Sequence, residues 1–284
     1  MNAGQKIASD LLLRYARKAD RMRTRYLFFD IDGTLAAGPI GRRYIPESAK
    51  RAIDLARAAG HVCAVATGRS HAMAEPYRQE LGLSLMVSDG GAGITIDGRL
   101  VALEPLDREP CLRLLEECEE KRVPWAISSD DSRFRTTIDR RFDDAVSEGY
   151  MDTIITPDLD FHDVPAFYKL YIACTAAEEH RLSRLSDVPQ ARFSPDCLFI
   201  EPVDKGAGIR RIMKHLNAPA EDVIVFGDGS NDLSMFCPEW TCVAMGNAID
   251  ELKERADLVT TDADDDGIWN ACVRLGLFPA NDAS

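Results

Sequence analysis

The sequence contains no long apolar run, no paired-cysteine motif and no hydrophobic leader. None of its apolar stretches approaches the ~18 residues that a membrane-spanning helix requires, which argues against a membrane-embedded protein. Near the N-terminus the longest unbroken apolar stretch is Leu11 to Leu13, too short for the core of a secretion signal. The eight cysteines include no CxxC pair and lie mostly inside apolar segments, so we expect reduced core thiols. These absences predict a cytoplasmic protein.

The motifs of several common enzyme classes are missing as well. No lysine follows a glycine, which excludes a phosphate-binding loop of the Walker type. There is no GxSxG serine elbow, and the five histidines show no HExxH spacing. The acidic run 262–266 imitates the start of a calcium loop, but Val273 stands where such a loop needs a glutamate. We interpret this run as a surface turn.

Positive charge is also scarce, because 47 acidic residues against 34 basic ones leave a net charge of −13 at pH 7. An acidic surface repels a polyphosphate backbone, so we expect no nucleic-acid binding. Residues 1–25 are the exception, with seven basic and two acidic side chains. The roughly helical spacing of their apolar residues is compatible with a basic amphipathic helix that makes a weak contact with a partner or an anionic surface. The interpretation that we favour is a helix packed on the body or a frayed extension, because chain termini are commonly loose.

From residue 26 onward, short apolar runs alternate with segments of helical periodicity. Helices are expected between the apolar runs, for example one that begins at Pro46 and ends at Gly60. The alternation predicts an α/β fold with a Rossmann-like parallel sheet, whose ligands bind beyond the carboxyl ends of the strands. The predicted strands of this sheet are 26–30, 62–66, 85–88, 223–226, 241–245 and 258–260.

The character of the sequence changes between about residues 105 and 190. This stretch has longer charged segments of helical type at 111–121 and 177–185, and a strand-like run at 167–174. We therefore predict an inserted second domain of α/β character. The predicted division is an extension at 1–25, a core made of 26–104 and 191–284, and an inserted domain at 105–190.

Polar clusters follow the first two core strands, where ligands of such sheets bind. Asp30 and Asp32 come directly after the first strand, so one carboxylate can reach a reacting centre with the other close by. That spacing alone is as typical of a solvated turn. Here it directly follows two phenylalanines and precedes Gly-Thr-Leu, which favours a catalytic role. Thr67-Gly68-Arg69 follows the second strand at the head of a helix, whose free N–H groups can bind an anion. By itself this is also an ordinary helix start.

Two more clusters lie in the second half of the core. Lys205 heads a helix and can neutralise a phosphate there, although most lysines are surface charges. Asp228, Asn231 and Asp232 lie on a glycine-bearing loop directly after the strand at 223–226. Two carboxylates and an amide make an oxygen-rich site suited to Mg²⁺.

In this order the four clusters resemble the haloacid dehalogenase superfamily of phosphohydrolases, and the chain is most similar to its Cof-type branch. The resemblance covers about residues 26–275 and implies a Rossmann-like parallel-sheet core with an inserted α/β cap domain at 105–190. The segments that carry it are FFDIDGTL at 28–35, ATGRS at 66–70, DKG at 204–206, FGDGSNDLSM at 226–235, VAMGNA at 243–248 and ADLVTTDADDDG at 256–267.

The resemblance implies a mechanism with a covalent intermediate. Asp30 would attack phosphorus and form an aspartyl-phosphate. Asp32 would protonate the leaving oxygen and then activate the water that hydrolyses the intermediate. Relatives that attack carbon or phosphonates typically lack an acid at this position, so Asp32 favours a phosphomonoester as substrate.

The resemblance also implies the ligands of the metal and of the phosphoryl group. Mg²⁺ would be held by the Asp30 carboxylate, the main-chain carbonyl of Asp32 and Asp228, with Asp232 and Asn231 completing its shell directly or through water. The transferring phosphoryl oxygens would be gripped by Thr67 and Lys205, with Gly68 and Arg69 beside them.

The cap would close over the site and determine which leaving group is accepted. Arg42 and Arg43 follow the first motif closely enough to face the substrate, and Arg133 and Arg135 of the cap are candidates for a second anionic group. For each of the four arginines a surface position is an equally good interpretation. Asp89 stands in the loop after the third strand where relatives usually have an amide, which bears on substrate contacts.

The resulting hypothesis is a cytoplasmic, Mg²⁺-dependent phosphatase that acts on a small phosphorylated metabolite. Its substrate would be a sugar phosphate or a phosphorylated cofactor such as FMN or pyridoxal phosphate. A sugar phosphomutase is the nearest alternative, and a regulatory or binding module on the same fold is the alternative from another class. The presence of Asp30, Asp32, Lys205 and Asp228 argues against the module.

Overall fold

The structure is a computed structural model that describes residues 23–39, 41–147, 149 and 151–278. Most of the predicted basic extension at 1–25 therefore lies outside the described residues. Where the description begins, Arg23 and Arg25 form ion pairs with Asp222, beside the start of a core strand. Among the described residues, no helix combines the length and the apolar character needed to cross a membrane.

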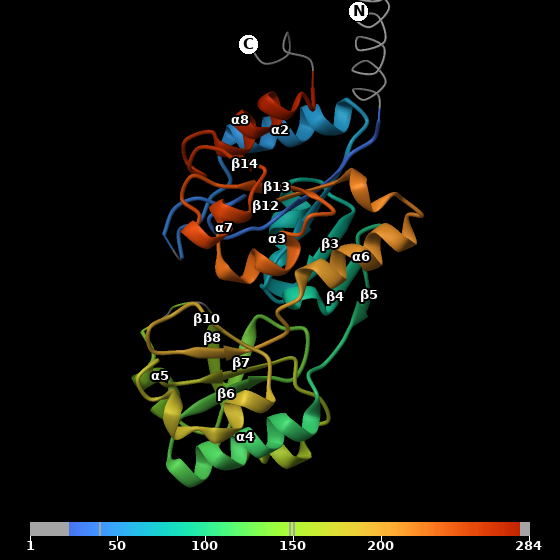
Figure 1. Ribbon diagram of the computed structural model, residues 1–284. Helices are drawn as coiled ribbons and strands as arrows, with labels where there is room; N and C mark the ends of the chain where they lie inside the picture. The colour runs from blue at the N-terminus through green and yellow to red at the C-terminus, as the bar shows by residue number, and fades with distance from the viewer. Residues whose placement is uncertain (1–22, 40, 148, 150, 279–284) are drawn as a thin grey trace, which may run out of the picture.

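The larger of two sheets forms the core, and it is mainly parallel as predicted (Figure 1). Its last two strands form a hairpin that the sequence did not predict, and they pair antiparallel with each other and with the neighbouring strand of the sheet. In sheet order the strands are β14 (Leu258–Val259), β13 (Thr241–Ala244), β12 (Val223–Gly227), β1 (Tyr26–Phe29), β2 (Val62–Ala66), β3 (Leu85–Ser88), β4 (Gly93–Ile96) and β5 (Arg99–Leu103).

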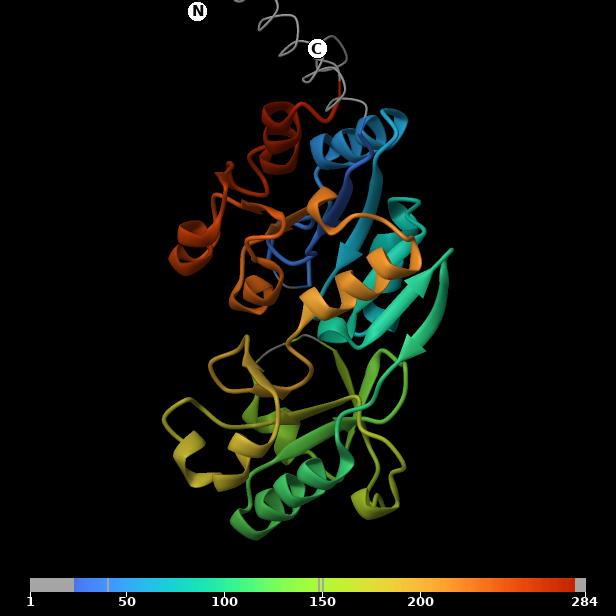
Figure 2. The ribbon, with the colours of Figure 1, turned by 45° about the vertical axis from the view of Figure 1, so that its right-hand side comes forward.

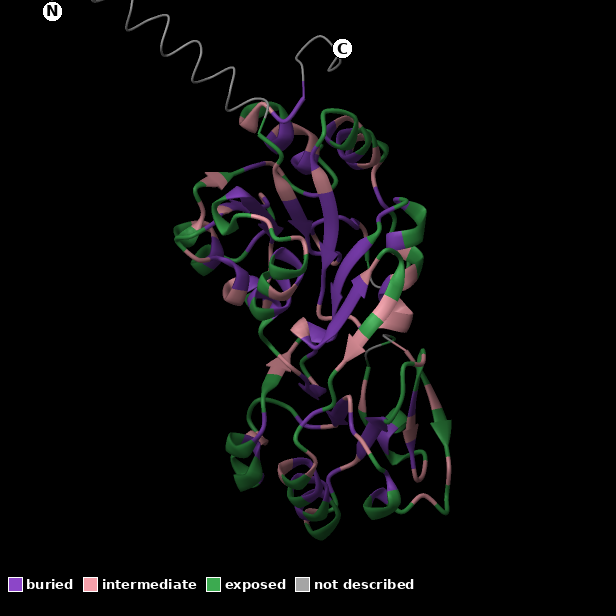
Figure 3. Cartoon of the chain, turned by 90° about the vertical axis from the view of Figure 1, so that its right-hand side faces the viewer, coloured by how far each residue is buried: buried purple, intermediate pink, exposed green. Residues whose placement is uncertain are grey.

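Helices cover both faces of the core sheet, because successive strand residues point to opposite faces. Leu27 and Phe29 of β1 are buried with the helices of one face, and Phe28 is buried with those of the other. Figure 3 shows the central strands of the sheet as a buried layer between partly exposed helices, with the edge strand only partly buried. The first face carries α2 (Glu47–Ala58), α3 (His71–Glu80) and α8 (Gly267–Leu275), and the second carries α6 (Lys205–His215) and α7 (Asp250–Arg255).

The smaller sheet forms the inserted cap, which lies beyond one end of the core sheet in Figures 1 and 2. Helix α4 (Arg108–Lys121) packs on one face of this sheet, and α5 (Arg141–Ala145) contributes Phe142 to the other. Its strands pair antiparallel except for β7 and β8. In sheet order they are β10 (Gln190–Arg192), β11 (Leu198–Ile200), β9 (Lys169–Ile172), β6 (Trp125–Ser128), β7 (Phe134–Thr137) and β8 (Asp152–Ile155).

One expectation about the cap is wrong, and we propose a different position for its C-terminal boundary. The helix predicted at 177–185 is wrong, since two short 3₁₀ turns stand there. The side chain of Glu117 on α4 accepts the N–H groups of Ser183 and Arg184, which takes these donors away from an α-helical pattern. In addition, β10 and β11 pair within the smaller sheet, so we propose that the cap ends after Ile200 rather than at residue 190.

The cysteines are all free thiols, as predicted, and every one except the half-buried Cys237 is buried. Burial in apolar surroundings raises the pKa of Cys63 and Cys111 to about 12. A thiol with so high a pKa carries little thiolate at neutral pH and is a poor nucleophile. The described cysteines therefore serve as small core residues.

Candidate active site

Neighbouring strands of the core sheet end side by side, and the polar clusters follow them. Phe29 of β1 lies in register with Phe226 of β12 and with Val65 of β2. The Phe29 and Phe226 rings stack 4.5 Å apart, and Asp30 N donates to Phe226 O over 3.0 Å. These contacts place Asp30, the loop after β12 and the loop after β2 at one edge of the sheet, on the side of the cap (Figure 2).

Lys205 lies at the centre of this edge, at the first turn of α6. Its Nζ donates to Asp30 Oδ1 and to Asp232 Oδ1, each over 2.6 Å. All three side chains are buried. Burial opposes the charge of Lys205, but the carboxylates of Asp232 and Asp30 outweigh it and raise its pKa above the ordinary value. The lysine therefore keeps its proton and fixes the two carboxylates relative to each other.

Asp228 is held by residues from two other loops, those after β1 and β13. Thr34 Oγ1 donates to its Oδ1 over 2.9 Å, and Asn247 Nδ2 reaches its Oδ2 over 3.4 Å while also donating to Gly33 O. Gly33 is required for this close approach, since a Cβ there would lie 2.2 Å from Asp228 Oδ2. Thr34 and Asn247 were not among the predicted site residues, although both lie inside segments that carry the family resemblance.

Asp232 organises the loop on which Asp228 stands. Its Oδ2 accepts the N–H groups of Asp228 and Gly229 over 2.8 and 2.9 Å, while its Oδ1 binds Lys205. Asn231 lies on the same loop, and a Cβ on Gly229 would lie 2.6 Å from its Oδ1. The loop after β12 is thus shaped by the side chain of Asp232.

The acidic cluster has a donor set that fits a divalent cation. Asp30, Asp228 and Asp232 each place a carboxylate oxygen within 4.8 Å of the others. Burial, opposed by Lys205 and reinforced by Asp232, raises the pKa of Asp30 well above its ordinary value. Burial and the Asp232 carboxylate also raise the pKa of Asp228 to about 7. This surplus of negative charge favours a cation, and a set of oxygen donors suits Mg²⁺.

Asp32 occupies a different electrostatic environment from Asp30. Arg69 Nε and Nη2 donate to its two oxygens over 2.6 and 2.7 Å, and Arg43 Nε lies 3.4 Å from Oδ1. Burial disfavours the charged form, but the hydrogen bonds and charge of Arg69 outweigh it and lower the pKa of Asp32. The Arg69 guanidinium also stacks 4.9 Å from the centre of the Tyr77 ring. Two of the predicted arginines thus reach a predicted catalytic carboxylate.

The loop after β2 holds Thr67 in a network of main-chain bonds. Thr67 is buried, its carbonyl accepts Gly90 N over 3.1 Å, and its Oγ1 accepts Arg69 N over 3.1 Å. Asn231 approaches the same loop, since a Cβ on Gly68 would lie 3.4 Å from Asn231 Nδ2. Two of the predicted clusters therefore meet at Gly68.

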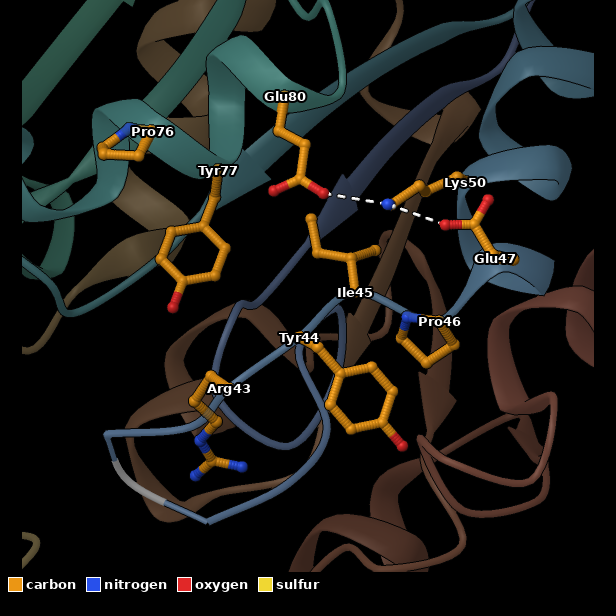
Figure 4. A pocket seen from close by; sticks show the side chains of 9 residues that line it. All are labelled: Arg43, Tyr44, Ile45, Pro46, Glu47, Lys50, Pro76, Tyr77 and Glu80. Carbon is orange, nitrogen blue, oxygen red and sulfur yellow. Dashed lines mark hydrogen bonds and ion pairs between the residues drawn. The ribbon is translucent and has the colours of Figure 1, made fainter.

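An open hollow of about 590 Å³ lies between the segment 43–50 and helix α3 (Figure 4). Arg43 lines it and reaches Asp32 from there. On the opposite wall Lys50 bonds to Glu47 and Glu80 over 2.8 and 2.9 Å. Arg42 is exposed and does not line this hollow.

A cap loop contacts the core at the first turn of α3. Asp131 Oδ1 accepts Ala72 N over 2.8 Å, and its Oδ2 lies 2.7 Å from His71 Nδ1. Arg133 Nε donates to Ala72 O over 3.1 Å. Arg133 is thus exposed at a contact between cap and core. The sequence offered no signal for Asp131, an aspartate in an ordinary charged loop.

A second contact between cap and core is formed by Lys169 of β9. Its Nζ donates to Gly68 O over 2.5 Å and forms a short ion pair with Glu201. Neither Lys169 nor Glu201 was a predicted site residue. One signal was present in the sequence, because Lys169 interrupts the apolar strand FYKLYIAC, where a charge needs a buried partner.

Two other residues singled out in the sequence, and Asp204 next to Lys205, have structural contacts. Arg135 is buried inside the cap, over the rings of Phe142 and Tyr171, which contradicts both a substrate contact and a surface position. Asp89 is buried, accepts His71 N over 2.9 Å, and has its pKa raised to about 6 by burial. Asp204 caps α6 by accepting Ala207 N.

The family model for haloacid dehalogenase-like hydrolases matches residues 27–272 of the chain. The Bacillus subtilis (strain 168) protein named "Putative phosphatase YkrA" is 32% identical over 263 residues, which cover 90% of this chain and 100% of that protein. The Escherichia coli (strain K12) pyridoxal phosphate phosphatase YbhA is 26% identical, over 87% of this chain and 97% of its own length.

Solved structures show the same arrangement of core and cap. A hypothetical protein from Geobacillus kaustophilus HTA426 superposes with a TM-score of 0.78 at 30% identity, over 90% of this chain and 100% of that one. The subclass IIB sugar phosphatase BT4131 superposes with a TM-score of 0.72 at 27% identity, with the same coverage.

Proposed function

The chain belongs to the haloacid dehalogenase-like hydrolases and is a phosphatase of that family, and we propose that it hydrolyses a small phosphomonoester through an aspartyl-phosphate on Asp30. The observation that carries the proposal is the buried contact of Lys205 with both Asp30 and Asp232. A buried lysine between carboxylates at the carboxyl edge of a parallel sheet positions a nucleophile and neutralises an incoming phosphoryl group.

In this proposal Asp30 is the nucleophile. Lys205 binds Asp30 Oδ1, and Oδ2 attacks phosphorus. A new O–P bond forms and the ester P–O bond breaks. Water then attacks the phosphorus of the intermediate, which releases inorganic phosphate and restores the carboxylate. Phosphoryl transfer of this kind depends mainly on positioning and charge neutralisation.

Asp32 is the proposed acid and base. It gives a proton to the leaving oxygen in the first step and removes one from the attacking water in the second. Arg69 and Arg43 keep the pKa of Asp32 low before substrate binds. A dianionic phosphate group brought close to Asp32 disfavours its charged form, so the substrate itself promotes protonation of this acid.

Mg²⁺ is the proposed cofactor. Its ligands would be the Asp30 and Asp228 carboxylates and the main-chain carbonyl of Asp32, with Asn231 and Asp232 completing the shell directly or through water. Bound there, the ion would supply charge neutralisation and would help to orient the phosphoryl group. Because Asp232 already binds Lys205 and two N–H groups, we assign it chiefly to shaping the loop.

Thr67 and Lys205 are proposed to bind the transferring phosphoryl oxygens. Gly68 and Arg69 are proposed to contribute from the same loop, whereas the first two N–H groups of α3 already bind Asp89 and Asp131. Arg43 is proposed to lie at the edge of the substrate site because it contacts Asp32. Arg42, predicted with it, is exposed, so we give it no role in binding.

The proposed substrate is a sugar phosphate or a phosphorylated cofactor. The relatives support this range, since one is named for pyridoxal phosphate and a structural neighbour is a sugar phosphatase. The cap covers the site and contacts α3 and the loop after β2. A lid of this kind excludes water and bulky leaving groups, which favours small esters.

The test is phosphate release from a panel of sugar phosphates, FMN and pyridoxal phosphate, with Mg²⁺ or with EDTA. We expect turnover that requires Mg²⁺ and falls by several orders of magnitude in Asp30→Asn, as for loss of a covalent nucleophile. Turnover that survives in Asp30→Asn would remove the proposed mechanism. An isomerised sugar phosphate without free phosphate would indicate a phosphomutase instead.

A further inference from the structure

Lys169 is a charged residue inside an otherwise apolar strand of the cap. It is 1% exposed, and its strand β9 is buried along its whole length. A buried ammonium group is costly unless it is paired and hydrogen-bonded. The partners of Lys169 therefore indicate its role.

The partners of Lys169 come from two segments outside its own strand. One is the carbonyl of Gly68, which lies between Thr67 and Arg69 in the loop after β2. The other is the carboxylate of Glu201, which is 2% exposed and begins the linker from β11 of the cap to α6 of the core. That linker ends at Lys205. One ammonium group thus joins a cap strand to both segments that carry the proposed phosphate ligands.

The loop after β2 and the linker from β11 to α6 are closely packed, so a shift of one displaces the other. A Cβ on Gly68 would lie 3.3 Å from Glu201 Oε1, so the loop after β2 rests on the linker. A Cβ on Gly90 would lie 1.7 Å from Pro202 O, and Gly90 N donates to Thr67 O. The linker cannot shift without moving the loops that hold Thr67.

We propose that Lys169 is a positioning residue, which fastens the cap to the Thr67 loop and to the Lys205 linker and so aligns the two phosphate ligands when the cap is in place. The proposal rests on the proposed function, because it takes Thr67 and Lys205 as the groups that bind the phosphoryl oxygens. Lys169 itself touches no reacting atom in this scheme.

The cap supplies a matched control for this residue. Lys121 on α4 also binds a carboxylate and a main-chain carbonyl, those of Glu117 and Arg181. All of its partners belong to the cap, far from the core. Lys121→Met therefore removes the same kinds of interaction, from a side chain that is 35% exposed, without touching the contact between cap and core.

The experiment compares Lys169→Met, Glu201→Gln and the double variant with wild type and Lys121→Met in the full chain. The readouts are kcat and KM on the best ester of the panel, and hydrogen exchange of peptides covering 66–73, 88–93 and the cap strands β6 and β9. The double variant keeps the test sound, because it leaves no unpaired buried charge to prevent folding.

We expect kcat to fall by about 100-fold in Lys169→Met, the cost of a misplacement near 1 Å at a reacting centre. The double variant should lose about as much as the single one, because the two residues act as a unit. Exchange should rise at 66–73 and 88–93 and stay unchanged in β6 and β9. Lys121→Met should leave kcat and the exchange of both loops at wild-type values.

Two outcomes would overturn the proposal. One is a double variant with wild-type kcat and wild-type exchange at both loops. The other is exchange that rises equally through β6 and β9, which would make Lys169 a residue of cap stability only. The exchange readout needs no turnover, so it tests Lys169 even if wild type hydrolyses no ester, a result that would refute the proposed function separately.

Discussion

The edge of the core sheet and the interior of the cap both bury charged side chains, but they compensate them differently. At the core edge a single lysine, Lys205, stands between Asp30 and Asp232, with Asp228 nearby, so negative charge is in excess. Inside the cap Arg135 lies over two aromatic rings and donates to Thr153 Oγ1 over 2.9 Å.

This difference in charge compensation distinguishes a ligand-binding site, at the core edge, from a structural interior, in the cap. Uncompensated charge costs stability, so a protein retains it where a ligand will complete it. The raised pKa values of Asp30 and Asp228 express that excess at the core edge. Inside the cap the rings of Phe142 and Tyr171 and a hydroxyl hold the charge of Arg135, so the arginine contributes to packing.

The largest effect is expected at the core edge, where the excess of negative charge is greatest, in Lys205→Met. Its loss removes the cation that fixes Asp30 and leaves two buried carboxylates facing each other. We expect kcat/KM to fall by at least about 1,000-fold, at the upper end of the loss of a preorganised electrostatic group. Phosphate release under saturating Mg²⁺ measures this effect. A variant that kept a tenth of the wild-type rate would contradict the assignment of Lys205.

The core fold was predictable because its buried strands are short apolar runs, several of them followed by a polar cluster. The predicted strands at 62–66 and 85–88 coincide with β2 and β3. The hairpin of β4 and β5 was missed, since the apolar run of β5 is only four residues long and none of its residues is buried. The helix predicted at 177–185 failed because the side chain of Glu117 competes for its N–H groups, a tertiary contact that periodicity does not reveal.

The residues of the candidate site also divide into those that the sequence revealed and those that only the structure revealed. Asp30, Lys205 and Asp228 were found because they lie within motifs close to strand ends or a helix start. Lys169 and Glu201 meet across 32 residues of sequence, and no local pattern predicts which carboxylate pairs with a buried lysine. Contacts between the cap and the core therefore had to come from the structure.

A moderate effect, on stability alone, is expected from Arg135→Met in the cap interior. The substitution removes the contacts of the guanidinium with the Phe142 and Tyr171 rings and its bond to Thr153. We expect a loss of about 2 kcal/mol in the free energy of unfolding, as for a desolvated cation–π contact. Urea unfolding measures it, with kcat/KM unchanged. A rise in KM without loss of stability would return Arg135 to the substrate site.

The smallest effect is expected where the cap meets the core at His71. The bond to Asp131, opposed by burial, raises the pKa of His71 above its ordinary value, and Glu75 and Asp89 act in the same direction. A raised pKa means that the ion pair contributes fully below the unfolded value of His, about 6.5, and is lost as the pH rises through the folded value. Asp131→Asn keeps an oxygen for Ala72 N and replaces the carboxylate oxygen that faces His71 Nδ1 with an uncharged amide nitrogen.

We therefore expect Asp131→Asn to lower the free energy of unfolding at pH 6 by up to about 1 kcal/mol, the range of a solvent-screened pair, and by less at pH 9. Asp160→Asn is the control, because its pair with His162 lies wholly within one exposed loop of the cap. Urea unfolding at both pH values measures the difference. An equal loss at pH 6 and pH 9 would mean that Asp131→Asn acts through the lost hydrogen bond to His71 Nδ1, and that charge contributes nothing to holding the cap on the core.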